Sequence, residues 1–457
     1  MDGSKLSGGV TGALPPVPCP VDLVGECGHS DGIWFGVGKI PVDISQGWKL
    51  YVSATVTNYV PTLIGVARIF FEKSIPFKYL NSHSRLRDQN AGIFGYSQVG
   101  KCIVAYTYRV AAIKELLLEL KMLLDASGHE GPFVPRVPFA WPGGSVFYRY
   151  GGYRSGDLRL GGQNVQDDRS EPRSIIARIP SNPFISIFPE VSARPQSVGF
   201  ALHSILERYP VTSPICRSGK GGVFIARNSQ SATREEVVVK IGLRLGNMLP
   251  DGRDASYFLA REFDMYQAMR ASGLSRWLAC PIAFSREAIG NLMVLEKICG
   301  QNLGQWRADG GVDVSRLVDA VSVIERVHEA GFSLGDAKTA NFIASPSGMV
   351  LLDLESAHCL SLTYEAMPST FGLKGLSGLS PTAFDVIHFL ISAVFKPDLP
   401  QVPLSIERSI DVPGFVHSFA PADLWDETAL KLLRIALQRL ADDPSLVSIA
   451  AAARLGC

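Results

Sequence analysis

The sequence predicts an α+β fold divided between two or three domains, and three observations carry this prediction. The chain has 457 residues, which exceeds what one hydrophobic core usually organises. Its 46% hydrophobic and 19% charged residues are typical of a globular protein. Strand-like and helical patterns mix in roughly the first 200 residues, whereas strands precede helices in the remainder.

The expected N-terminal domain spans residues 46–200, behind a flexible segment of residues 1–45 that is rich in Gly and Pro. Four stretches have the composition and alternation of strands: "WKLYVSATV", "PFKYL", "KCIVAYTY" and "SVFYRYGGY". Two stretches have helical spacing, "NYVPTLIGVARIFFEK" and "AAIKELLLELKMLLDASG", and Gly128 ends the second. Residues 155–195 are polar with several Pro, Gly and Arg, which indicates a long loop or an interdomain linker.

The expected C-terminal domain spans residues 201–457, with one lobe at about 201–298 and another at about 299–457. A short helix leads into "ICRSGKGGVFIARN" and "EEVVVKIGL", which predict strands around a Gly-rich turn. The stretch "ASYFLAREFDMYQAMRASG" predicts a helix and "NLMVLEKI" a strand, and the later stretches predict helices, the last of them over residues 427–443. Strands followed by helices is the order of a two-lobed kinase-like fold.

A set of phosphate-handling residues runs along this second domain. Each signal is weak alone, because Gly-rich turns occur in many hairpins and a Lys or Glu usually faces water. Phosphoryl transfer needs backbone amides around the nucleotide phosphates, a Lys held by a carboxylate, an Asp near the attacking hydroxyl and oxygen ligands for Mg²⁺. Each group occurs once and in kinase order: Gly219, Gly221 and Gly222 in the turn, Lys240 at a strand end, Glu262 in the next helix, then Asp336, Lys338, Asn341 and Asp353.

Charge suggests a role for each of the later residues. Asp336 would orient and partly deprotonate the acceptor hydroxyl, and Lys338 would balance charge on the transferred phosphoryl group. Asn341 and Asp353 are hard oxygen ligands suited to Mg²⁺. The earlier residues would bind ATP or another nucleoside triphosphate. We expect Asp385, which opens an apolar helix, to be a structural hydrogen-bond acceptor.

Two departures from the kinase pattern leave an alternative open. Leu334 stands where kinases usually have His, and "DLE" at residues 353–355 replaces the usual Asp-Phe-Gly. A non-catalytic peptide-binding scaffold would explain both departures. The retention of every charged residue in the set argues against it.

Longer stretches of both domains resemble one enzyme family. The first domain, from "GWKLYVSATVTNYVPTLIGVARIFFEKSIPFKYLNS" through "NAGIFGYSQVGK" and "ELLLELKMLL" to "GSVFYRYGGY", resembles the lyase domain of class III and class IV lanthipeptide synthetases. In the second domain "VVVKIG", "GRDASYFLAREFDMYQAM", "GDAKTANF" and "LLDLESA" are similar to the kinase domain of the same enzymes. The resemblance covers roughly residues 45 to 455.

The resemblance implies a two-step dehydratase acting on a ribosomally made precursor peptide with a leader. The kinase would phosphorylate Ser or Thr, and a phosphoSer/Thr lyase would eliminate phosphate to leave dehydroalanine or dehydrobutyrine. Lys78 matches the family's base, whose pKa the site must lower because a free amine is protonated in water. Lys49 matches a phosphate-binding Lys, and Lys101 and Arg149 are further phosphate contacts. The alternative is that these cations are solvated on the surface.

The resemblance breaks at Tyr51, where the family has a general-acid His. Tyr51 and Lys49 are two residues apart on one strand, so their side chains share a face. A phenol with a pKa near 10 is a poor acid at neutral pH. The lyase is therefore slower, assisted by another residue such as His83, or degenerate. In the last case the protein would be a peptide Ser/Thr kinase whose lyase-like domain only binds substrate.

Charge, cysteine content and hydropathy limit the binding partners and the cellular compartment that we expect for this protein. The formal net charge of +1 gives no reason to expect nucleic acid or an anionic membrane as a partner. The eight cysteines show neither zinc-site spacing nor a disulfide framework, which suggests reduced thiols in the cytoplasm. The start lacks a signal-peptide pattern, and the most apolar stretch, residues 383–395, is too short to span a bilayer. The lanthipeptide synthetases that both domains resemble normally continue into a cyclase domain, and we expect this chain to lack one. We therefore expect a separate cyclase or tailoring enzyme to close rings.

Overall fold

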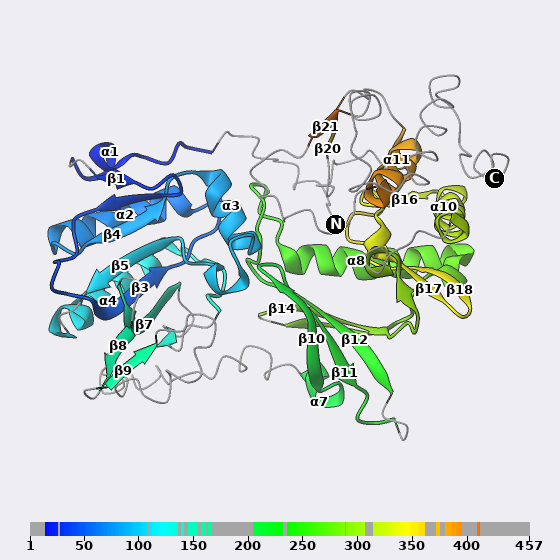
Figure 1. Ribbon diagram of the computed structural model, residues 1–457, viewed down its shortest axis with the longest axis horizontal. Helices are drawn as coiled ribbons and strands as arrows, with labels where there is room; N and C mark the ends of the chain where they lie inside the picture. The colour runs from blue at the N-terminus through cyan, green and yellow to red at the C-terminus, as the bar shows by residue number, and fades with distance from the viewer. Residues whose placement is uncertain are drawn as a thin grey trace, which may run out of the picture.

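A computed structural model describes most of the first 361 residues and three short segments after them. The described residues are 14–361, with gaps at 26–27, 108–109, 136–138, 141–144, 154–156, 161–162, 167–203, 232–234, 288 and 307–313, and then 372–374, 380–394 and 409–411. The predicted α+β class is confirmed by two main antiparallel sheets, each packed with helices (Figure 1). Most of the expected linker at 155–195 and the expected helix at 427–443 lie outside the described residues.

The first sheet has seven strands in the order β1-β2-β4-β5-β3-β7-β6, and every neighbouring pair is antiparallel. Two long helices contribute to its buried core, in which Leu50 of the sheet lies with Leu63 and Leu120 of the helices. The elements of this part are β1 (His29–Ser30), β2 (Trp34–Val37), β3 (Gln46–Val52), β4 (Phe77–Leu80), β5 (Ile103–Thr107), β6 (Phe139–Ala140), β7 (Val146–Gly152), α1 (Pro20–Val24), α2 (Tyr59–Glu72), α3 (His83–Ala91), η1 (Tyr96–Gln98) and α4 (Val110–Ser127), with a separate hairpin of β8 (Asp157–Leu160) and β9 (Gln163–Gln166).

The structure differs from the sequence prediction at two places in this part. Residues 1–45 were expected to be flexible, yet β2 is a strand of the sheet and pairs with β4, so that Gly36 lies opposite Lys78. Helix α3 was not predicted. Its buried positions include the polar residues Asp88, Gln89 and Asn90, so it lacks the apolar periodicity by which helices are recognised.

The second sheet has five strands in the order β10-β11-β12-β14-β13. Helix α8 packs against it through Leu259 and Tyr266, which share a buried cluster with Met293 of the sheet. Lys240 lies within β12 and not at its end as predicted, because β12 continues to Leu243 opposite β14. The elements are α7 (Ser204–Arg208), β10 (Val211–Ser218), β11 (Gly221–Arg227), β12 (Glu236–Leu243), α8 (Ala255–Met269), β13 (Pro281–Glu287) and β14 (Gly290–Glu296), and the short helical turns η2 (Arg270–Leu274) and η3 (Ser275–Trp277) follow α8.

A mainly helical part follows the second sheet and carries the loop that contains Asp336. Leu317 and Ile324 of one helix and Ile387 of another lie in a single buried cluster. The described elements are β15 (Gln301–Asn302), α9 (Leu303–Trp306), α10 (Val314–Glu329), β16 (Phe332–Ser333), η5 (Thr339–Asn341), β17 (Phe342–Ser345), β18 (Gly348–Leu351), β19 (His358–Cys359), β20 (Gly372–Lys374), α11 (Pro381–Val394) and β21 (Ser409–Asp411).

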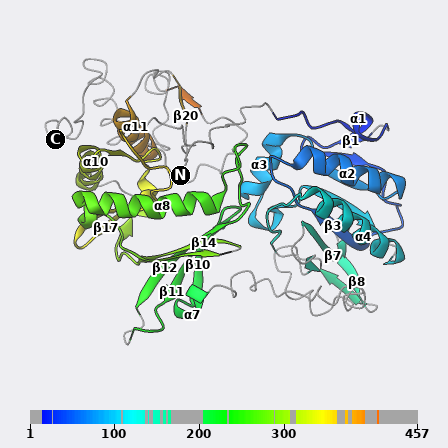
Figure 2. The same cartoon turned by 180° about the vertical axis from the view of Figure 1, so that it is seen from behind.

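The two sheet-containing parts touch at the end of α3. The amide of Gly219, in the β10–β11 turn, donates a hydrogen bond of 3.1 Å to the carbonyl of Ala91. Arg244 and Glu130 form an ion pair that also joins the two parts. Figure 2 shows α3 at the border between the blue and green parts of the molecule. Within the described residues no helix is both long and apolar enough to cross a membrane.

Candidate functional site

Strand register in the first sheet places the predicted cations on one face. Lys49 of β3 lies opposite Arg149 of β7 on one side and opposite Tyr106 of β5 on the other. Tyr51 lies opposite Val104, which in turn lies opposite Lys78 of β4. Because Leu50 between them belongs to the core on the helix-covered face, Lys49 and Tyr51 face the opposite side.

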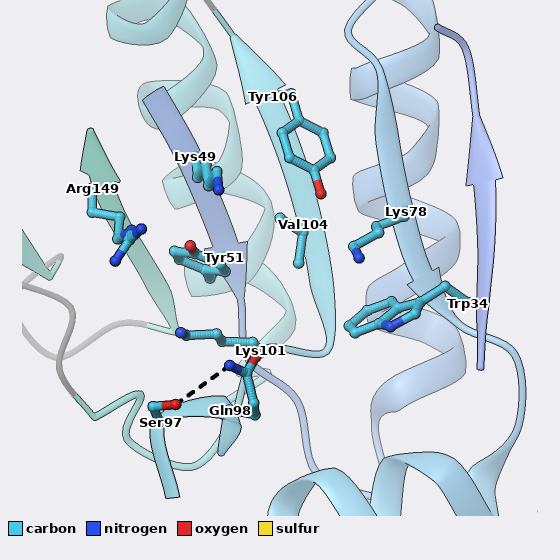
Figure 3. A pocket seen from close by; sticks show the side chains of 10 residues that line it. All are labelled: Trp34, Lys49, Tyr51, Lys78, Ser97, Gln98, Lys101, Val104, Tyr106 and Arg149. Atoms are coloured by element: carbon cyan, nitrogen blue, oxygen red, sulfur yellow. Dashed lines mark hydrogen bonds between the residues drawn. The ribbon is translucent and has the colours of Figure 1, made fainter. Parts of the chain in front are cut away.

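These side chains line one pocket (Figure 3). The structure brings together all five residues that the sequence assigned to the first domain, although Lys49 and Lys101 are only 6% and 9% exposed. Among the described residues that line the pocket, four are cations and none is a carboxylate. Such a pocket favours an anionic ligand. Its lining residues are Trp34, Lys49, Tyr51, Lys78, Ser97, Gln98, Lys101, Val104, Tyr106 and Arg149.

Aromatic rings hold two of these ammonium groups. The Lys78 Nζ lies 4.3 Å from the centre of the Trp34 ring, and the Lys101 Nζ lies 5.0 Å from the centre of the Tyr51 ring. Both distances are within the range of cation–π attraction. Trp34 was not predicted as a site residue, because it lies in the segment expected to be flexible. It assigned Tyr51 the role of an acid and did not foresee that its ring would lie beneath Lys101.

His83, the suggested substitute acid, is not among the residues that line this pocket. It lies at the start of α3, and its Nε2 is 2.8 Å from the carbonyl of Pro15. The other end of α3 does support the pocket, because Gln89 Nε2 donates a hydrogen bond of 3.1 Å to the carbonyl of Lys101.

The phosphate-handling residues predicted for the second domain form a second constellation, between the five-stranded sheet and the helical part. Its members are Lys240, Glu262, Asp336, Lys338, Asn341 and Asp353. Lys240 of β12 donates to both carboxylate oxygens of Glu262 at 2.7 Å and to Asp353 Oδ1 at 3.0 Å. Burial raises the pKa of the Glu262 carboxyl to about 7, against the opposing charge of Lys240. Burial also opposes ionisation of Asp353, but Lys240 and Lys338 outweigh it and hold the pKa of Asp353 well below its usual value. Asp353 is therefore an anion across the physiological range.

The loop containing Asp336 is held by buried hydrogen bonds. Asp385 of α11 accepts from the amides of Leu334 and Gly335, both at 2.7 Å, and from Ser333 Oγ at 2.8 Å. This geometry agrees with the structural role expected for Asp385. The Leu334 side chain, at the position of the usual His, lies in the hydrophobic core. At the other end of the loop, Lys338 Nζ donates to Asp336 Oδ2 at 2.7 Å.

Asn341 and Asp353 fit the donor set of a Mg²⁺ site. The Asn341 amide nitrogen donates to the carbonyl of Asp336 at 3.0 Å, which leaves its Oδ1 as the ligand atom. Asp353 has a φ of 58°, a left-handed conformation that Asp tolerates better than most residues. The part of the chain that the structure describes contains no group of three or more His, Cys, Asp or Glu residues suited to hold a metal. That result is compatible with a metal held by one carboxylate, one amide and substrate phosphates.

The Gly-rich turn lies close to this constellation. Lys220, between Gly219 and Gly221, forms an ion pair with Glu355, two residues after Asp353. A Cβ at Gly221 would lie 2.0 Å from the carbonyl of Ile241, so the turn needs glycine there for close packing. Gly222 is already part of β11 and pairs with Ile241.

The sequence reading missed His388, which reaches Asp336 from α11. Its Nδ1 lies 2.6 Å from the carbonyl of Ala337, and its Nε2 lies 3.7 Å from Asp336 Oδ1. Burial lowers the pKa of His388, so the ring is neutral at physiological pH and donates from Nδ1 to the carbonyl. Its position three residues after Asp385, on the same helix face, could have revealed it. Lys220 could likewise have been recognised between the glycines of the turn.

The chain is similar to a described protein family and to a bacterial protein. Residues 28–174 match the family described as "RamC, N-terminal domain". The chain is also 27% identical over 364 residues to a "Probable SapB synthase" of Streptomyces coelicolor. That similarity covers 72% of this chain and 37% of the relative, so the chain spans little more than a third of that protein. The first match contains the strands β1 to β7 and all ten residues of the pocket.

Proposed function

We propose that the protein is a bifunctional dehydratase in lanthipeptide biosynthesis, which phosphorylates Ser or Thr of a precursor peptide and then eliminates the phosphate. The observation that carries the proposal is the presence, on one chain, of two groups of charged residues that are suited to binding phosphate. One combines Lys240, Glu262, Asp336 and Asp353, and the other is a pocket lined by four cations. The similarity to a SapB synthase and to the RamC N-terminal domain supports the same assignment.

In the first step the peptide hydroxyl attacks the terminal phosphorus of ATP. The Asp336 carboxylate accepts the hydroxyl proton, the new oxygen–phosphorus bond forms, and the bond from the terminal phosphorus to the leaving ADP breaks. Lys338, 2.7 Å from Asp336, is positioned to neutralise charge on the phosphoryl group. Asn341 and Asp353 would hold Mg²⁺, which supplies positive charge to the phosphate oxygens when bound.

In the second step the phosphorylated side chain occupies the cation-lined pocket. Lys78 must first lose its own proton to act as the base; its amine then removes the α-proton, the carbon–carbon double bond forms, and the bond from Cβ to oxygen breaks to release phosphate. Lys49, Lys101 and Arg149 bind the leaving phosphate, and Arg149 can do so with two parallel hydrogen bonds. The Tyr51 hydroxyl can donate a hydrogen bond to the same group.

The favoured alternative is a peptide kinase whose first domain only binds the phosphorylated product. The position of the Tyr51 ring beneath Lys101 favours it, because a π platform for a phosphate-binding cation needs no acid function. The two candidates share the first step and differ only in the second.

One experiment separates the candidates. The protein is incubated with ATP, Mg²⁺ and a Ser/Thr-rich precursor peptide encoded beside it, and the mass of the peptide is followed with time. Loss of water supports the dehydratase, and a gain of phosphate that persists supports the kinase alone. An unchanged peptide, with a second precursor also unchanged, contradicts both and supports a binding scaffold.

A further inference from the structure

Two backbone amides of the β10–β11 turn donate hydrogen bonds within the protein. The Gly219 amide donates to Ala91 of α3 at 3.1 Å, and the Lys220 amide donates to Ser218 Oγ at 3.2 Å. A Cβ at Gly219 would lie 1.5 Å from the carbonyl of Asn90, so glycine there permits close docking on α3. The sequence predicted that the backbone amides of this turn bind the nucleotide phosphates. Both amides already donate hydrogen bonds within the protein. The turn can therefore contact phosphate through a side chain instead.

Lys220 is the side chain that reaches from the turn toward the Asp336–Asp353 constellation. It forms an ion pair with Glu355, although 135 residues separate the two in the sequence. The segment that carries Glu355 is fixed by Arg261 of α8, which donates to the carbonyl of Ala357 at 2.9 Å and to that of Glu355 at 3.4 Å. The charge of Lys220 also helps to lower the pKa of Asp353. Lys220 thus acts electrically on the residue proposed to hold Mg²⁺.

The Lys220–Glu355 ion pair is suited to open when another anion competes for Lys220. The Lys220 side chain is 45% exposed and that of Glu355 is 26% exposed, so water screens their attraction. A nucleoside triphosphate carries more charge than one carboxylate and offers more acceptor oxygens. A flexible ammonium group gains more contacts from such a ligand than from Glu355.

We propose that Lys220 is a phosphate-binding residue of the nucleotide site and that Glu355 is the partner it leaves when a nucleoside triphosphate binds. The inference rests on the proposed kinase function and adds a ligand from the turn to Lys240 and Lys338. It also gives the Glu of the "DLE" sequence a role, because Glu355 competes with nucleotide for Lys220. The substitution of Glu for the usual Gly then weakens nucleotide affinity.

The test measures the affinity for ATP directly by calorimetry, together with KM and kcat for peptide phosphorylation. We expect Lys220→Ala to weaken ATP binding about tenfold and Lys220→Arg to retain most of it. Glu355→Gln should have the opposite effect and strengthen ATP binding a few fold, because it frees Lys220. Lys297→Ala is the matched control and should bind ATP normally, since Lys297, directly after β14, is 38% exposed and pairs with Glu236 of β12.

The signs of these effects decide the outcome. If the Lys220–Glu355 ion pair has only a structural role, Lys220→Ala and Glu355→Gln should shift ATP affinity in the same direction. That result would overturn the proposal. Normal ATP affinity in Lys220→Ala, with binding lost in Lys240→Ala, would overturn it while leaving the kinase function intact. If the unaltered protein binds no ATP, the proposed kinase function fails and this inference fails with it.

Discussion

The cation-lined pocket of the first sheet and the constellation around Asp353 are both suited to phosphate, yet their charges are arranged differently. Among the described residues that line the pocket there are four cations and no carboxylate. Around Asp353, Lys240, Lys338 and Lys220 are paired with Glu262, Asp336 and Glu355 respectively. The first arrangement attracts an anion by net charge, and the second holds its cations in place with acidic partners.

This difference matches two tasks. Phosphoryl transfer requires a triphosphate to be aligned with an acceptor, so each ammonium group must have a fixed direction, and carboxylate partners supply it. Elimination requires a base and a place for the leaving phosphate, and excess positive charge serves the second need. Nearby cations also favour the neutral form of an amine base. Substitutions in each region should therefore affect separate steps.

The largest expected effect is that of Asp336→Asn. Loss of the proton acceptor should lower phosphorylation by about 10² to 10⁴-fold, and dehydration should disappear with it because no phosphopeptide forms. Peptide mass spectra over time measure both steps. Asp319→Asn, an exposed position on α10, is the control and should behave as the unaltered protein. Undiminished phosphorylation by Asp336→Asn would remove Asp336 from the mechanism.

Lys78→Ala should affect only the other region. We expect phosphopeptide to accumulate, with the elimination rate lowered by about 10² to 10⁴-fold and the phosphorylation rate unchanged. A chemically phosphorylated peptide supplied without ATP isolates this step. Lys73→Ala, which removes a surface partner of Glu119 in the same part, is the control. If Lys78→Ala still gives dehydrated product at the normal rate, Lys78 is not the base.

Much of the pocket could be predicted because local patterns fix it. Alternation along "WKLYV" places Lys49 and Tyr51 on one face, and the apolar Leu50 between them assigns the other face to the core. The spacing of Asp336, Lys338 and Asn341 similarly determines that these side chains lie on one short loop. Both signals depend on neighbours in the sequence.

The contacts that could not be predicted depend on tertiary packing. Trp34 reaches Lys78 only because β2 pairs with β4 across more than forty residues of sequence. Lys220 meets Glu355 through the closure of the β10–β11 turn on a loop of the helical part. Helix α3 escaped notice because it buries polar side chains, such as Gln89, that support the pocket by hydrogen bonds. No periodicity in the sequence records such pairings.

A pH profile should show a moderate effect that is confined to phosphorylation. Burial raises the pKa of Glu262 to about 7, so the carboxylate that holds Lys240 is ionised above this pH and protonated below it. At pH 6 a group with this pKa is about one-tenth ionised, and phosphorylation should fall several fold between pH 8 and pH 6. Glu262→Gln should be slower and lack this inflection. Elimination from a phosphopeptide should lack it too, and the same inflection there would assign it to another group.

The smallest expected effect concerns Tyr51, and it tests whether the pocket is a lyase site or a binding site. Tyr51→Phe keeps the ring beneath Lys101 and removes the hydroxyl, so elimination should slow by less than about tenfold if the phenol only donates a hydrogen bond. Tyr51→His restores the acid found in the enzymes that this domain resembles and should accelerate elimination from a phosphopeptide. Phosphorylation rates serve as the internal control and should not change. If Tyr51→His gives no dehydrated product while phosphopeptide still binds, the pocket holds phosphate without expelling it, and the two regions share a ligand but not a reaction.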